Sequence, residues 1–266
     1  MSAAKPAGIV FSAAGAPHVA EAVRAARSSL RHNAVPHVLF ADGAPQDVPE
    51  GLDVVAFEPT ENAYADKIAN IARSPFERTI YLDTDTYVVA EIVHLLELLD
   101  RYDLAAAHAP GYRGMADPDV PAAFYELNTG VIAWRASEAT AAFLGDWRST
   151  YLAWTSDQPF AGAGRSAPAD AAGAGPGSAG RAADQPAFRH CVWRHGLALY
   201  VLGPEYNLRL GEPATLVAPV RVIHGRHPDP EALAARIDDR RGPRHWPRHV
   251  GWRERAVRGL RRRGLG

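Results

Sequence analysis

The apolar residues of this chain gather in short β-branched or aromatic runs, which alternate with longer stretches of helical spacing. From Pro17 to Arg31, the apolar positions Val19, Val23 and Ala26 recur every three or four residues and predict a helix that buries one face. The short runs predict strands at Gly8–Ser12, Pro36–Phe40, Leu52–Phe57, Arg78–Leu82, Leu104–His108, Ala198–Leu202 and Val220–His224. Further helices are predicted from Asn62 or Ala63 to the residue before Pro75, and at Ile92–Leu99, Ala139–Tyr151 and Ala187–His195.

Strands that alternate with helices predict an α/β fold, in which a mainly parallel central sheet is flanked by helices on both faces. Ligands of such sheets bind beyond the carboxyl ends of the strands. The small-residue segment Ser12–Gly15 and the acidic segment Asp83–Asp85 both follow predicted strands. A third polar segment opens Glu126–Arg135, which we interpret as a turn that runs into another strand.

The composition changes sharply at two places. Residues 161–183 are almost entirely Ala, Gly, Ser and Pro, which bury too little apolar surface to offset the entropy of ordering them. Residues 238–266 hold ten arginines against three acidic residues, a net charge of +7, which leaves −8 for the rest of a chain of net charge −1. We therefore expect one domain over residues 1–236, with a flexible insertion at 161–183, and a basic tail over 237–266. That tail could contact an anionic membrane surface or remain a solvated terminus.

Several classes of protein are disfavoured by what the sequence lacks. The single cysteine, Cys191, cannot form an internal disulfide, and no metal site can be built from thiolates. The only lysines are Lys5 and Lys67, and no Walker-type Gly-Lys-Ser/Thr occurs. The start of the chain does not have the pattern of a signal peptide, and no run approaches the ~18 apolar residues of a membrane span. We expect a cytoplasmic protein without a nucleic-acid partner.

The residues that point most directly to chemistry are Asp83 and Asp85, within Thr-Ile-Tyr-Leu-Asp-Thr-Asp-Thr-Tyr-Val-Val at 79–89. The alternation of a strand places the two carboxylates on one face, where they repel unless a cation or several donors lie between them. Carboxylate oxygens suit Mg²⁺ and Mn²⁺, which keep open positions for substrate phosphates. The pair therefore indicates a divalent cation and a nucleotide or diphosphate ligand, although an Asx-turn at a strand end would need no ligand.

Two other acidic motifs do not fit the same residues. An EF-hand loop that began at Asp83 would need Gly and Glu where the chain has Val88 and His94. A phosphatase of the haloacid-dehalogenase type would need a later lysine, and none follows Asp85.

The ordered set of motifs between Ile9 and His227 resembles the retaining glycosyltransferases of family 8, which have the GT-A (Rossmann-like) fold and include glycogenin and bacterial galactosyltransferases. The motifs are Ser12–Gly15, Lys67, Leu-Asp-Thr-Asp-Thr, Leu-Asn-Thr-Gly-Val, Asp-Gln-Pro-Ala, Pro-Glu-Tyr-Asn-Leu and Val-Ile-His. The resemblance implies transfer of a sugar, with retention, from a nucleoside-diphosphate sugar such as a UDP-sugar. The acceptor is not indicated.

The resemblance also implies a role for individual residues. Asp83, Asp85 and His224 would bind Mn²⁺ or Mg²⁺, and Asn128, Asp184 and Gln185 would lie beside the sugar. The residues expected to contact the donor are Phe11, Ser12, Ala13, Gly15, Lys67, Thr84, Gly130 and Arg226. Arg226 would stand in for a lysine that the family often carries in its closing motif and that this chain lacks.

Each of these roles has a purely structural alternative. Lys67 could lie on a solvated helix face, His224 could bond the backbone with His227 as its competitor, and the turn at Asn128 could be ordinary. Asp184 could cap the helix that begins at Pro186. Asp157 belongs to a near-copy of the Asp184 motif, and we favour Asp184 because an apolar helix follows it.

Two other functions fit the same predicted fold. A nucleotidyltransferase that makes sugar nucleotides usually carries a basic residue in its N-terminal loop, and residues 11–17 contain neither Lys nor Arg. A catalytically silent binding module would have no need of the like-charged pair.

Overall fold

The computed structural model describes residues 5–60, 62–110, 117–156 and 183–247. Residues 161–182 of the predicted insertion, Asp157 and the end of the basic tail from residue 248 therefore lie outside the described residues, and those predictions remain untested. Within the described ranges, no helix is both long enough and apolar enough to cross a lipid bilayer.

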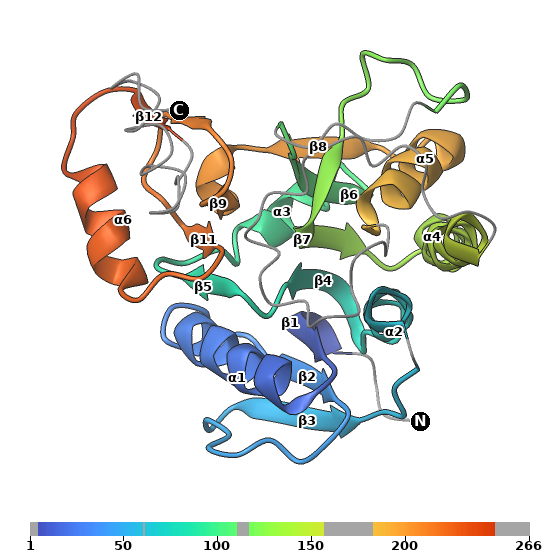
Figure 1. The fold of residues 1–266 in the computed structure, drawn as a ribbon, viewed down its shortest axis with the longest axis horizontal. Helices are drawn as coiled ribbons and strands as arrows, with labels where there is room; N and C mark the ends of the chain where they lie inside the picture. The colour runs from blue at the N-terminus through green and yellow to red at the C-terminus, as the bar shows by residue number, and fades with distance from the viewer. Residues whose placement is uncertain (1–4, 61, 111–116, 157–182, 248–266) are drawn as a thin grey trace, which may run out of the picture.

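The centre of the molecule is a seven-stranded sheet in the order β3-β2-β1-β4-β7-β6-β8 (Figure 1). Its strands are β1 (Lys5–Ala13), β2 (His37–Ala41), β3 (Leu52–Ala56), β4 (Phe76–Leu82), β6 (Leu104–His108), β7 (Leu127–Arg135) and β8 (Leu199–Leu202). Neighbouring strands are parallel except at β7, which runs antiparallel to both β4 and β6. The predicted α/β fold with a mainly parallel central sheet is confirmed.

Helices cover both faces of this sheet, as Figure 1 shows. The helices α1 (Ala16–Leu30) and α3 (Leu95–Leu98) lie on one face, and α2 (Ala63–Ile71), α4 (Glu138–Ser156) and α5 (Gln185–His195) lie on the other. The alternation of β1 explains the two layers, because Phe11 belongs to the core beneath α1 whereas Val10 belongs to the core beneath α2. The helix predicted at Ile92–Leu99 is shortened to the single turn of α3.

A second, three-stranded sheet was not predicted. It consists of β5 (Thr86–Val88), β11 (Val222–His224) and β9 (Leu208–Arg209), in the order β5-β11-β9. The run at 79–89 is therefore not one strand, because the chain turns after β4 and enters the second sheet as β5. In that sheet β5 is antiparallel to β11, and Thr86 is paired with His224.

The predicted domain boundary at residue 236 falls inside a helix, α6 (Pro230–Asp238). Beyond α6, β12 (Arg244–Trp246) pairs with β10 (Ala214–Leu216), and the Asp238 carboxylate accepts the Val220 N–H at 3.1 Å. The described part of the expected tail thus belongs to the folded domain. Its residues complete α6, pair with β10 through β12, and pack through Ile237 and Trp246 against a hydrophobic cluster.

Several segments that carry the predicted motifs lie along one edge of the main sheet. The carboxyl ends of β1, β4, β6 and β8 lie along it, and β7 begins there because it runs in the opposite direction. The segment at Asn128–Gly130, expected as a turn, is already part of β7. It therefore lies beside the end of β4, with the Asp83 N–H donating to the Gly130 carbonyl at 2.8 Å.

Candidate active site

Asp83 and Asp85 lie in the turn between β4 and β5. The Asp83 carbonyl accepts the Thr86 N–H at 3.1 Å and the Thr86 hydroxyl at 2.7 Å, and Thr84 is half-buried between the two acids. The strand-alternation argument for this pair was therefore wrong, because neither residue is in a strand. The turn nevertheless directs both carboxylates toward His224.

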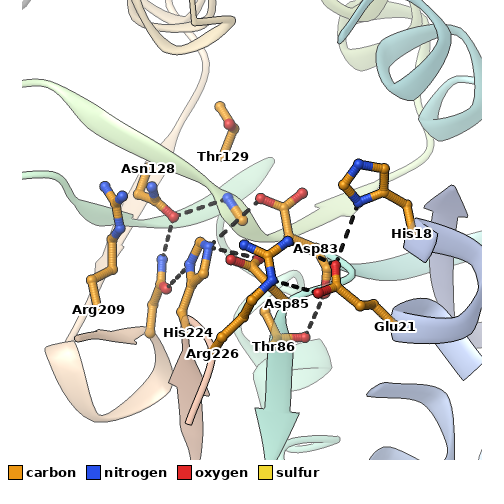
Figure 2. A network of polar contacts seen from close by, with 12 residues as sticks. His18, Glu21, Asp83, Asp85, Thr86, Asn128, Thr129, Arg209, His224 and Arg226 are labelled. Carbon is orange, nitrogen blue, oxygen red and sulfur yellow. Dashed lines mark hydrogen bonds and ion pairs between the residues drawn. The ribbon is translucent and has the colours of Figure 1, made fainter. Parts of the chain in front are cut away.

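His224 completes a three-residue cluster with the two acids (Figure 2). Its Nε2 lies 3.3 Å from Asp85 Oδ1 and 3.8 Å from Asp83 Oδ2, and one ligand atom from each residue fits within 4.8 Å of the others. Its Nδ1 contacts the Asn207 side chain at 2.8 Å, so the ring is held by side chains and not by the backbone. The competitor His227 instead accepts the Asp229 N–H in a turn.

The chemistry of this cluster fits a divalent cation. The two carboxylates are ligands that suit Mg²⁺ and Mn²⁺, and an imidazole nitrogen is a common ligand of divalent transition metals. Burial would raise the pKa of Asp85, but His224 and Arg226 outweigh it and hold that pKa below its ordinary value. Asp85 is therefore ionised at neutral pH and available as a ligand.

Gly130 leaves the space in which the cluster forms. A Cβ added at this position would lie 2.1 Å from His224 Cε1 and 2.9 Å from Asp83 Oδ2. The backbone at Gly130 thus lies directly against the side chains of the cluster. Any larger residue would displace the imidazole or the carboxylate.

Lys67 lies beside the cluster, buried, and not on a solvated helix face. Its Nζ is 2.9 Å from Asp83 Oδ1, 3.2 Å from Asp184 Oδ2 and 3.0 Å from the Thr129 carbonyl. Burial by itself disfavours the charged amine, but the carboxylates of Asp184 and Asp83 raise the pKa of Lys67 above its ordinary value. The ammonium therefore stays charged and links the two acids.

Asp184 occupies the position before α5, as expected, but its side chain does not cap the helix. Its Oδ1 accepts the Thr129 hydroxyl at 3.0 Å, and its Oδ2 faces Lys67. Burial raises the pKa of Asp184, with Lys67 opposing the shift. The structure thus brings Asp184 to the same network as Asp83.

Asn128 and Gln185 also meet at the site. Asn128 Nδ2 donates to Gln185 Oε1 at 2.6 Å, and Asn128 Oδ1 accepts from Gly130 N at 3.0 Å and from Asn207 Nδ2 at 2.7 Å. Sequence reasoning had assigned no role to Asn207, although it lies in the Pro-Glu-Tyr-Asn-Leu motif. The parallel pairing of β9 with β11 places it next to His224.

The small-residue segment after the first strand is only partly a loop. Phe11, Ser12 and Ala13 belong to β1, and the Phe11 ring is fully buried in the core. A donor contact through this ring is therefore excluded, because the core encloses it. Ser12 accepts a hydrogen bond from Asn70 at 3.0 Å. Gly15 has a φ of 85°, which glycine adopts readily, and its N–H donates to Asp42 at 2.7 Å.

Arg226 extends from the segment after β11 to α1. Its guanidinium forms an ion pair with Glu21 at 2.5 Å, and the side chain is 46% exposed (Figure 2). The position beside Asp85 is consistent with the predicted phosphate contact, which remains a prediction.

Glu126 is a buried acid that sequence reasoning missed. Its Oε1 has no hydrogen-bond partner among the described residues. Burial raises the pKa of Glu126 to about 7, with Arg189 opposing the shift and Asp184 adding to it. An apolar run that follows a Glu does not by itself reveal a buried carboxyl, so the sequence held no clear signal.

A second group of possible ligands, Asp117, Asp119 and His190, lies elsewhere. His190 Nδ1 is 2.7 Å from Asp117 Oδ2, and Asp117 Oδ1 accepts the Asp119 N–H. These bonds close a turn onto α5, and we assign the group a structural role.

No protein-family model matches the chain, and no curated protein matches it. The solved structure of the glycosyltransferase GlyE from Streptococcus pneumoniae TIGR4 aligns with 78% of this chain and 47% of its own, at 18% identity and a TM-score of 0.49. The chain thus spans about half the length of GlyE, and a likeness at this level carries no functional conclusion.

Gly130→Ala should disrupt the cluster, because the added methyl group collides with His224. We expect a loss of about 1–3 kcal/mol in the free energy of unfolding, typical of overpacking, and at least tenfold weaker Mn²⁺ binding. Gly145→Ala is the matched control, because a Cβ there meets no atom within 4 Å and the position is helical and exposed. Denaturant unfolding and calorimetric Mn²⁺ titration measure both effects. Equal behaviour of the two variants would contradict the steric role.

Glu126→Gln should stabilise the protein more at high pH than at low pH. Because the folded-state pKa is raised from 4.5 to about 7, the contribution of Glu126 is fully present below pH 4.5 and is lost as the pH rises through 7. The Gln variant does not titrate, so its stability relative to the wild type should rise by up to roughly 3 kcal/mol between pH 5 and pH 8. Urea unfolding at both pH values measures this, with the exposed Glu97→Gln as control. A pH-independent difference would refute it.

Proposed function

We propose that this chain is a glycosyltransferase that uses Mn²⁺ or Mg²⁺ to bind a nucleoside-diphosphate sugar, a UDP-sugar in particular, and transfers the sugar to an acceptor. The observation that carries the proposal is the convergence of Asp83, Asp85 and His224 at the edge of the sheet where α/β proteins bind ligands. The ordered motifs of the sequence, with their resemblance to family 8, support the same function.

Asp83, Asp85 and His224 would hold the cation, and the contacts of Asp83 fix how its carboxylate is oriented. When bound there, a divalent cation supplies Lewis-acid neutralisation of the charge on a diphosphate leaving group. The two carboxylate oxygens of Asp83 have different partners. Oδ1 contacts Lys67 and accepts the Tyr81 hydroxyl, and Oδ2 faces His224. The carboxylate is thus oriented before any ligand arrives.

The residues beside the cluster would orient the sugar. Asp184 and Gln185 lie at the start of α5 next to Lys67 and Asn128. We expect their acidic and amide oxygens to face the donor sugar. Such groups hold sugar hydroxyls by hydrogen bonds and exclude alternative poses. Asp184 is the copy of the duplicated motif that we propose to be functional.

For the stereochemistry, we expect retention at the anomeric carbon, on the basis of the family resemblance. NMR of the freshly formed product measures the anomeric configuration directly. An inverted product would place the chain among inverting transferases of the same fold.

Binding of UDP should require the divalent cation, because two carboxylates and two phosphates repel each other without one. Calorimetric titration of the protein with UDP should show at least a hundredfold weaker binding in the presence of EDTA than in the presence of Mn²⁺. Asp85→Asn should abolish turnover and keep the fold. Asp83→Asn, in contrast, should also reduce stability, because Asp83 pairs with buried Lys67.

Asp146→Asn, on the exposed surface of α4, is the control and should leave UDP binding and turnover unchanged. Equal UDP affinity with and without EDTA would refute the metal-dependent function. Metal-dependent UDP binding without donor hydrolysis or transfer would favour a binding module, and release of diphosphate from a nucleoside triphosphate would favour a nucleotidyltransferase.

A further inference from the structure

We propose that Asn207, oriented by Asn128 and Gly130, holds His224 in the tautomer that carries its proton on Nδ1. In that tautomer Nε2 has a free lone pair, which faces Asp83 and Asp85. The consequence for cation binding rests on the proposed function, whereas the tautomer itself follows from the hydrogen bonds of the protein alone. Asn207 is thereby assigned as a positioning residue that acts through His224.

The backbone nitrogen of Gly130 can only donate a hydrogen bond. This nitrogen lies 3.0 Å from one terminal atom of the Asn128 side chain. The atom must be the oxygen, since an amide NH₂ in its place would set two donors against each other. The backbone therefore fixes which way the Asn128 amide points.

The orientation of Asn128 determines that of Asn207. The oxygen of Asn128 lies 2.7 Å from a terminal atom of Asn207, which must then be its NH₂ group. The other terminal atom of Asn207 is consequently its oxygen, and it lies 2.8 Å from His224 Nδ1. An oxygen without a proton can only accept, so His224 Nδ1 must donate.

The same bonds run in one direction through the site. His224 donates to Asn207, Asn207 donates to Asn128, and Asn128 donates in turn to Gln185 Oε1 at 2.6 Å. Asn128 is 3% exposed, Asn207 4% and His224 8%, so bulk water has little access to replace a missing partner. Reversal of the Asn128 amide would set its NH₂ group against the Gly130 N–H, and reversal of the Asn207 amide would set its oxygen against that of Asn128. Each reversal leaves buried polar groups unpaired, so the order is self-consistent.

The two acids alone would favour the other tautomer. Asp85 Oδ1 lies 3.3 Å from Nε2 and would accept a proton carried there. A proton on Nε2 would occupy the lone pair that a cation needs, because only an unprotonated ring nitrogen is a metal ligand. Asn207 opposes this tendency and keeps Nε2 prepared for a cation.

The experiment measures the tautomer in the cation-free protein. Two-bond ¹H–¹⁵N spectra, recorded up to a pH at which the ring is neutral, distinguish a protonated ring nitrogen from an unprotonated one. His224 is identified by comparison with His224→Gln. We expect a protonated Nδ1 and an unprotonated Nε2 in the wild type, and a shift of the population toward protonated Nε2 in Asn207→Leu, which removes the acceptor at similar volume.

Two further variants separate positioning from general damage. Asn207→Asp retains an acceptor for Nδ1–H and should retain the wild-type tautomer. Asn33→Leu removes a buried asparagine from a different network, in which it bonds Ser29 and Ile92, and should leave His224 unchanged. In calorimetric Mn²⁺ titrations, Asn207→Leu should bind about 10–100-fold more weakly than the wild type, and Asn33→Leu should bind equally well.

A protonated Nε2 in the neutral ring of the wild type, or an unchanged tautomer in Asn207→Leu, would overturn the proposal. Loss of the tautomer in Asn33→Leu would overturn it as well, because the effect would then be nonspecific. These spectra require neither cation nor nucleotide. Failure of the wild type to bind Mn²⁺ would therefore count against the proposed function, while the spectra would still decide the assignment of Asn207.

Discussion

The interaction on which the site depends is the buried contact of one ammonium group with two carboxylates. Lys67 of α2 joins Asp83, which follows β4, to Asp184, which precedes α5, and it also bonds Thr129 of β7. Four segments far apart in the chain are fixed at one point. Removal of one partner from a buried ion pair typically costs about 3–5 kcal/mol, because the remaining charge cannot be solvated. The contact that positions Asp83 therefore also contributes to the stability of the domain.

The reversed direction of β7 supplies the second constraint. Because β7 begins at the edge where β4 ends, the Gly130 backbone lies against the turn of Asp83 and Asp85. The absence of a side chain at Gly130 lets His224 approach from the second sheet. Backbone direction, a missing Cβ and the pairing of His224 with Thr86 together make a cluster that no single element contains.

Much of this arrangement could be predicted from the sequence. The apolar runs indicated all seven strands of the main sheet, and the motif order predicted that Asp83, Asp85, His224 and Asp184 lie near one another, as they do. The sequence could not show that the chain turns after β4, because Thr86–Val88 is as β-branched and apolar as the strand before it. It also gave no indication that Lys67 is buried or that Asn207 contacts His224. Both facts depend on tertiary contacts between segments that have no local signature.

The placement of most site segments at one edge of the main sheet also bears on how this protein can change in evolution. The opposite edge, where β1 and β4 begin and β7 ends at Arg135, carries the short connections from α1 to β2 and from α2 to β4. Mutations and insertions in those connections lie away from the cluster of Asp83, Asp85 and His224, whereas any change in length between Leu82 and Thr86 alters the turn that carries the two acids. Sequence drift should therefore be uneven along the chain, with the two edges diverging at different rates among descendants of a common ancestor.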